Sequence, residues 1–384
     1  MNWRERLPLL VCYASMAALA VPGNLIALSL TQFGREFQVT NEALGRLPAV
    51  TCTSLVIALL LGGPLADRLG PRRFFLTGSG LLLLGQLGYA FCTGYPQALI
   101  SSFLYGAGIG CLDLIASPVV AALYPQNKAA MLNRVHAFFS IGCVVALGGG
   151  LAALSLNLNW RIGFLVFSIV PLAVFIAALR APFPAIHHEE SKLSGAMLVR
   201  RMLFWLLFLL IFFCGASETG LAVWLPAHVE RTFATTPMAG GFALFAFFIA
   251  MSIGRLFGGK VLESVTPERL LFIAAAITAP LIAVAAWSAN PWVSCGAATL
   301  IGLAVSVMWP TCLAIASGHY PTGGATLFGL LSASGNASGI ATPWMIGWIA
   351  DRSTIQNGVG MTALAPIMML VLIPVLRLRR TPES

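Results

Sequence analysis

Long apolar runs separated by short polar segments make up almost the whole chain. Each run has about the 20 residues that an α-helix needs to cross the hydrocarbon core of a bilayer. We interpret the first run as a membrane helix and not a signal peptide, because it is long enough to span and many more follow. The predicted transmembrane helices lie near 9–30, 45–66, 74–94, 97–123, 132–155, 160–179, 203–227, 238–260, 268–288, 292–316, 324–349 and 359–376.

A constant offset of 196 residues relates the two halves of the chain, which indicates an internal duplication. The offset pairs Gly62 with Gly258, Asp67 with Glu263, Pro71 with Pro267, Gly106 with Gly302, and Tyr124 with Tyr320. The longest polar segment, 181–201, falls between the halves. We therefore predict a six-helix bundle over 1–180, a cytoplasmic linker over 181–201 and a second six-helix bundle over 202–384.

Composition supports a membrane protein: 58% of the residues are hydrophobic and 9% are charged. The net charge of +9 does not indicate a nucleic-acid partner, because the basic residues are confined to short loops. The eight cysteines lie in apolar runs and are interpreted as buried free thiols. His187 and His188, beside two glutamates, are interpreted as solvated linker and not as a metal site. We expect no metal, no cofactor and no enzymatic activity.

The distribution of lysine and arginine predicts the orientation. Most of the 22 basic residues lie in segments that are cytoplasmic if the N-terminus is cytoplasmic, as the positive-inside rule requires. We therefore expect both termini on the cytoplasmic side of a plasma membrane, the inner membrane in a bacterium.

The segment 62–73, GGPLADRLGPRR, lies between two apolar runs and is predicted to form a tight loop at the membrane surface. Its pattern G-x-L-A-D-R-x-G resembles the signature loop of the major facilitator superfamily, although Pro71 stands where that signature usually has a basic residue. The resemblance implies twelve helices in two halves that move by alternating access. The expected gating residues are Gly63, Asp67, Arg68, Gly70, Arg72 and Arg73.

Two acids lie well inside apolar runs, Asp113 in the fourth and Glu218 in the seventh. An ionised carboxylate at that depth is strongly disfavoured unless it is paired, hydrated or protonated. Both acids are therefore candidate proton-coupling or substrate sites, against the alternative of a structural acid satisfied by a neighbouring helix. The chain also lacks a Walker-type nucleotide loop, which excludes ATP hydrolysis by this chain as the driving force.

Three regions resemble the fucose:proton symporter-like branch of that superfamily: 108–118 together with 132–142, then 215–226, and 308–311. The resemblance implies a substrate site of Asn24, Asp113, Trp224 and Trp309, with Glu218 and Asp113 coupling protons. The acid that this branch carries on its first helix is missing here. For the two tryptophans, lipid-facing or interfacial packing is the alternative. His136 is interpreted as a buried structural histidine, and Arg255 as part of a second gating loop.

The sequence thus predicts an all-α transporter, most simply a proton-coupled importer of a sugar or a similar small polar solute. The alternative is a proton-driven efflux antiporter for drugs or amphipathic metabolites, which the many Phe, Met and Leu residues favour. The expected partners are the solute, the proton and the lipid bilayer, and the protein is expected to be monomeric.

Overall fold

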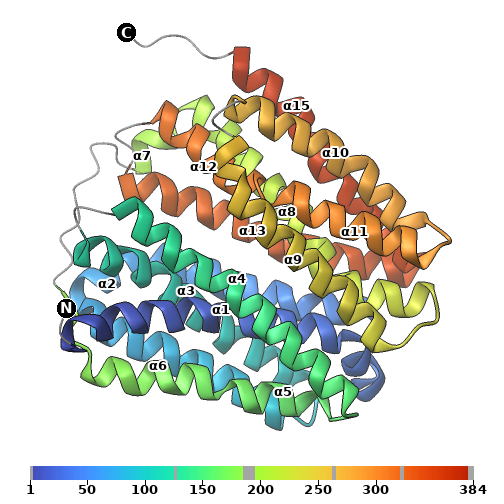
Figure 1. Cartoon of the computed structure of the whole chain (residues 1–384), viewed down its shortest axis with the longest axis horizontal. Coiled ribbons are helices and arrows are strands. Elements are labelled where there is room, and N and C mark those ends of the chain that lie inside the picture. The colour runs from blue at the N-terminus through green and yellow to red at the C-terminus, as the bar shows by residue number, and fades with distance from the viewer. Residues whose placement is uncertain (1–2, 125–127, 185–194, 262–264, 321–323, 379–384) are drawn as a thin grey trace. The chain divides into compact units, whose positions relative to one another are not determined.

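The computed structural model describes residues 3–124, 128–184, 195–261, 265–320 and 324–378, and these residues form helices without strands (Figure 1). The first half contains α1 (Trp3–Phe37), α2 (Asn41–Phe91), α3 (Tyr95–Leu123), α4 (Lys128–Ser155), α5 (Trp160–Phe167) and α6 (Ile169–Arg180). The second half contains α7 (Gly195–Leu198), α8 (Met202–Thr232), α9 (Pro237–Val261), α10 (Pro267–Trp287), α11 (Pro291–Val305), α12 (Met308–His319), α13 (Gly324–Arg352), α14 (Ile355–Gly360), a short 3-10 turn (Met361–Ala363) and α15 (Leu364–Leu378).

Within the described residues, eleven helical stretches are long and apolar enough to cross a membrane. The twelfth predicted helix is present as α13, 29 residues long but rich in glycine, serine and threonine. Small residues of this kind let membrane helices approach closely. A side chain at Gly215 in α8, for example, would collide with the carbonyl oxygen of Gly335 in α13. The prediction of an all-α membrane fold is confirmed.

The predicted loop between the second and third helices is much shorter than expected. Helix α2 runs through it, and the one residue with non-helical dihedral angles is Gly70, at φ 75° and ψ 164°. Positive φ is accessible to glycine without steric cost, and Pro71 then stands where a helix begins, a position that suits its fixed φ. The connection is therefore a break of a single residue.

Contacts divide the chain into two compact units, one of Met1–Val39 with Arg46–His188 and one of Thr40–Gly45 with Glu189–Ser384. The first turn of α2 belongs to the second unit because Asp351 caps it. The Asp351 carboxylate accepts the backbone N–H groups of Asn41 at 2.9 Å and Glu42 at 2.6 Å. A carboxylate at this position satisfies free N–H groups and complements the helix dipole. His187, His188, Glu189 and Glu190 lie outside the described residues.

The internal geometry of each unit shows the duplication. Gln38 and Ala234, 196 residues apart, both have φ of 51°. Tyr124 and Tyr320 end α3 and α12 with nearly the same dihedral angles, φ −131° and ψ 65° against φ −130° and ψ 69°. Gly106 packs against the carbonyl of Thr51, and Gly302 packs in the same way against that of Phe247.

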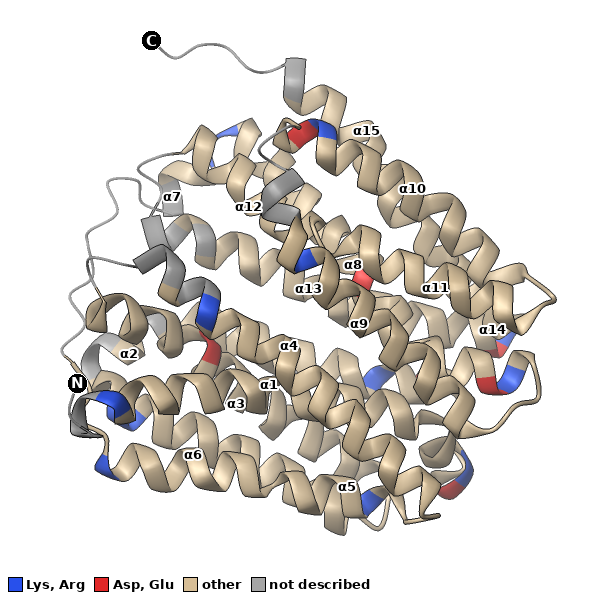
Figure 2. Ribbon diagram, viewed as in Figure 1, with Lys and Arg blue, Asp and Glu red and all other residues tan. Residues whose placement is uncertain are grey.

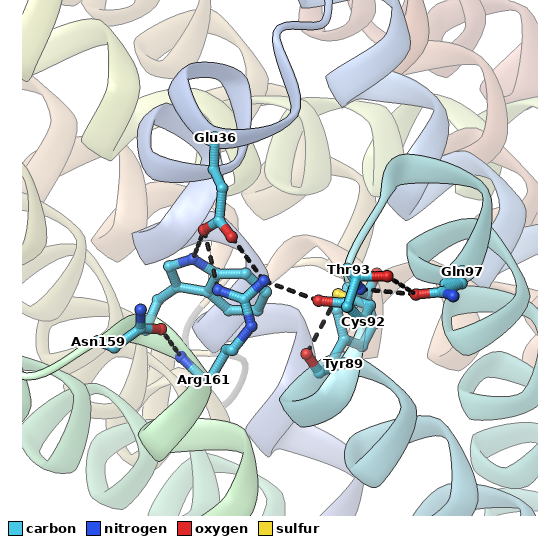
Figure 3. A network of polar contacts seen from close by, with 8 residues as sticks. Glu36, Tyr89, Cys92, Thr93, Gln97, Asn159 and Arg161 are labelled. Atoms are coloured by element: carbon cyan, nitrogen blue, oxygen red, sulfur yellow. Dashed lines mark hydrogen bonds and ion pairs between the residues drawn. The ribbon is translucent and has the colours of Figure 1, made fainter.

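A polar network joins three helix ends of the first unit (Figure 3). The carboxylate of Glu36 in α1 accepts the indole N–H of Trp160 at 2.7 Å and pairs with Arg161 at 2.6 Å. The Arg161 guanidinium also donates to the carbonyl of Cys92 after α2, at 2.7 Å. Arg161 therefore fixes the end of α1 and the end of α2 to the start of α5.

Candidate functional site

The second unit holds an ion pair in the interior of its helices. The side chain of Glu218, near the middle of α8, lies 3.7 Å from the guanidinium of Arg255 in α9. Figure 2 shows that charged residues otherwise gather mainly near the ends of helices. The two side chains stay partly accessible, 21% for Glu218 and 29% for Arg255. An acid and a base in contact inside the helices lower each other's cost of desolvation.

The assignment of Arg255 to a gating loop is wrong. Helix α9 continues to Val261, so Arg255 lies within the helix, and its side chain reaches Glu218. Arg255 already lies within the predicted helix near 238–260, and what the sequence does not show is that its side chain reaches Glu218. The sequence signal for this ion pair is that Arg255 lies on the predicted helix directly after the one that carries Glu218, and consecutive helices often pack together. Glu263, its predicted companion, lies outside the described residues.

Neutral and aromatic side chains surround the ion pair. Cys214, one helical turn before Glu218, has Glu218, Arg255 and Cys312 of α12 as its neighbours. Trp309 lies one turn before Cys312, partly accessible, with its ring edge packed against Gly335. Because Gly335 also packs against Gly215, the ring of Trp309 lies close to the part of α8 that carries Glu218.

Helix α12 begins beside this site because the chain is interrupted between α11 and α12. Pro310 has no N–H to donate to the carbonyl of Ser306, so a helical hydrogen bond is missing at the junction, although Ser306 and Val307 keep helical dihedral angles. Gly254, next to Arg255, packs directly against the hydroxyl of Ser306. The interruption therefore lies against the segment of α9 that carries Arg255.

Trp224, predicted to lie at the substrate site, is fully buried. Its indole N–H donates to the carbonyl of Pro343 in α13 at 2.9 Å. This ring therefore packs α8 against α13 and presents no face to a solute in this structure.

The first unit holds a second group of polar residues, on α3 and α4. Asp113 is partly accessible, and His136 is its electrostatic neighbour. The imidazole of His136 also lies 3.3 Å from the hydroxyl of Ser117, one turn after Asp113. The interpretation of His136 as a buried histidine is wrong, since its side chain is exposed. An acid, a hydroxyl and an imidazole thus meet between these two helices.

Asn24 lies in a part of α1 where the helical hydrogen-bond pattern is altered. Its side chain is 6% accessible, and its amide nitrogen donates to the carbonyl of Ala20 at 2.7 Å. Just before it, the hydroxyl of Tyr105 accepts from the N–H of Gly23 at 3.1 Å and lies 3.4 Å from the carbonyl of Leu19. The phenol thus stands in the place of one helical hydrogen bond, next to Pro22.

The predicted gating residues are described in part. Gly70 is the break in α2, and Arg72 donates to the carbonyl of Ala181 at 3.0 Å after α6. Arg73 is exposed. The side chains of Asp67 and Arg68, and the surroundings of Gly63, lie outside the described part of the chain. Among the described residues, no group of His, Cys, Asp and Glu is arranged to hold a metal ion.

The sequence pattern of the Major Facilitator Superfamily matches residues 10–226 and 207–384, which together cover nearly the whole chain. The chain belongs to the Major Facilitator Superfamily. It is 26% identical over 377 residues to the L-fucose-proton symporter of Escherichia coli, covering 87% of this chain and 84% of the relative. It is 27% identical over 294 residues to the 3-(3-hydroxy-phenyl)propionate transporter of Escherichia coli, covering 73% and 71%.

A superfamily structure has the same fold. The crystal structure of a D-xylose-proton symporter superposes with a TM-score of 0.79, covers 94% of this chain and 96% of that chain, and is 16% identical. The protein is therefore an integral membrane transporter of this superfamily. The expected resemblance to its fucose:proton symporter-like branch is confirmed by the match to the L-fucose-proton symporter.

Proposed function

We propose that this transporter imports a sugar or a similar small polar solute together with a proton, by alternating access. The observation that carries the proposal is Glu218, a partly accessible carboxylate inside the membrane helices, one turn after Gly215, which packs on the same glycine of α13 as the ring of Trp309. A carboxylate there can take up and release a proton, and an aromatic face suits the C–H groups of a sugar ring. The relatives named as symporters of L-fucose and D-xylose support import over the efflux alternative.

In this mechanism the two acids have different roles. Glu218 holds the coupled proton, since its side chain remains accessible to water, and Arg255 stabilises the carboxylate once the proton has left. Asp113, with Ser117 and His136 beside it, binds solute hydroxyls and is a second proton-coupling candidate. Trp309 supplies the aromatic face. Asn24 contributes through its oxygen, because its nitrogen is already bonded within α1. The gating residues around Gly70 control the change of access.

Accumulation in proteoliposomes tests this function. With an inside-alkaline pH gradient, we expect the purified protein to accumulate at least one labelled solute above its external concentration, and a protonophore to abolish the accumulation. Solute uptake that only equilibrates, with or without the gradient, would contradict proton coupling. Extrusion of hydrophobic cations driven by the gradient would instead favour the efflux alternative.

Cysteine labelling tests the proposed orientation, with both termini in the cytoplasm. Trp292, at the start of α11, is 85% accessible, and Arg180, at the end of α6, is exposed. We expect Trp292→Cys to react with an impermeant maleimide in intact cells, and Arg180→Cys to react only after the cells are opened. The parent protein, with its eight native cysteines, is the control. The reverse pattern would contradict the charge-based orientation.

A further inference from the structure

Arg255 has binding capacity that Glu218 does not use. Its closest approach to Glu218 is 3.7 Å from Nη2, longer than the 2.7–2.9 Å of a charge-assisted hydrogen bond. Its Nε is buried and has no hydrogen-bond partner among the described residues. A guanidinium offers five N–H donors in a planar fork that fits a carboxylate through two of them. The arrangement therefore leaves donors that a second carboxylate can use.

Among the described residues, Arg255 is the positively charged neighbour of Glu218. On α8 the titratable neighbour of Glu218 is Cys214, which has Cys312 of α12 as its own neighbour, and on α9 it is Arg255. Helix α13 faces this part of α8 with Gly335 and Ser338, which carry no charge. The two thiols are neutral when protonated, so the site is balanced as one anion and one cation.

This balance links proton binding to anion binding. When Glu218 takes up a proton, Arg255 keeps its charge without a counter-ion and with its Nε buried, and an unpaired charge among membrane helices is costly. An incoming carboxylate removes that cost by replacing Glu218 on the guanidinium. The net charge of the site is zero before the exchange and zero after it. One proton and one monovalent anion then occupy the site together.

We infer that the transported solute is a hydroxylated monocarboxylate of the sugar-acid class, and that Arg255 binds its carboxylate once Glu218 is protonated. The inference rests on the proposed function, in which Glu218 holds the coupled proton. It narrows the solute from any small polar molecule to one that carries a carboxylate. It also makes transport electroneutral, because the proton offsets the charge of the anion.

Matched solutes test the class. D-Gluconate and D-glucitol differ at one carbon, a carboxylate against an alcohol, and D-glucuronate and D-glucose form a second such pair. With purified full-length protein, we expect the acids to raise the melting temperature at pH 5.5 and to accumulate under an inside-alkaline gradient. The neutral partners should do neither. An inside-negative potential of 100 mV, which changes the accumulation of a carried charge about 50-fold, should leave uptake of the acids nearly unchanged.

Variants of Arg255 test the residue. Arg255→Gln should weaken binding of the acid about 10- to 100-fold, and Arg255→Lys should restore part of it. Arg180→Gln, which removes an exposed arginine from α6, is the control and should bind normally. Should Arg255→Gln fold poorly, the double variant Glu218→Gln with Arg255→Gln removes both charges and should likewise lose acid binding.

The outcomes separate the two proposals. Proton-driven accumulation of the neutral sugars, unaffected by Arg255→Gln, would overturn the carboxylate class and leave the proposed function intact. Binding and uptake of the acids without any response to the pH gradient would overturn proton coupling and keep Arg255 as an anion site. If neither acid binds nor accumulates, the sugar-acid inference is overturned.

Discussion

Glu218→Gln is expected to abolish accumulation against a gradient while leaving exchange of solute across the membrane. Glutamine has the shape of protonated glutamic acid and keeps its hydrogen-bonding capacity, so it mimics the loaded state permanently. Exchange of solute for solute needs no deprotonation, whereas net uphill uptake does. In proteoliposomes the accumulation ratio should therefore fall to about one, and solute binding should lose its dependence on pH near neutrality.

Glu218→Asp is the matched control for this result, because it keeps the acid and shortens the side chain by one methylene. It should retain some uphill uptake with altered affinity. Counterflow, in which labelled solute enters vesicles preloaded with unlabelled solute, shows that the variant is folded and active. Uphill uptake by Glu218→Gln at the normal level would remove Glu218 from coupling and leave Asp113 as the remaining candidate.

Asp113→Asn is expected to weaken solute binding by about 10- to 150-fold at every pH. The expected loss is that of one charge-assisted hydrogen bond, about 1.5–3 kcal/mol. Asp113 lies beside His136 on the accessible part of α3 and α4, where it can reach solute hydroxyls. Equilibrium binding measured by calorimetry between pH 5.5 and 8 would show the loss directly.

Ser117→Ala separates contact with the solute from a local structural effect in this region. It removes the hydroxyl that lies 3.3 Å from His136 and leaves the charge of Asp113 in place. We expect it to change affinity only a few fold. Affinity that is unchanged in Asp113→Asn, or a loss confined to one end of the pH range, would contradict a role in binding hydroxyls.

Much of the fold could be predicted because a bilayer fixes the length of its helices. The spacing of apolar residues is enough to predict the membrane helices. The repeated glycines are enough to predict the two halves and the offset between them. The isolation of Glu218 and Asp113 in apolar sequence also made them candidates. The structure shows that each has a charged or ionisable neighbour, Arg255 for Glu218 and His136 for Asp113.

The rest of the site depends on packing that sequence spacing does not record. Trp224 and Trp309 are equivalent as residue types, but a carbonyl of α13 engages Trp224, whereas Trp309 stays partly open. The exposure of His136 depends on which face α4 turns to its neighbours, and the partner of Arg255 depends on which face α9 turns to α8. Each of these outcomes is set by a neighbouring helix, and a single sequence does not show which residues of two helices meet.

The interruption before Trp309 is a difference between the two copies of the duplicated unit. Pro310 aligns, at the offset of 196, with Leu114, and α3 runs unbroken through that position. The first copy therefore has a continuous helix where the second has a missing hydrogen bond between α11 and α12, although Ser306 and Val307 keep helical dihedral angles. Leucine at position 310 would supply the N–H that proline lacks, so the weak point in the helix follows from one side chain.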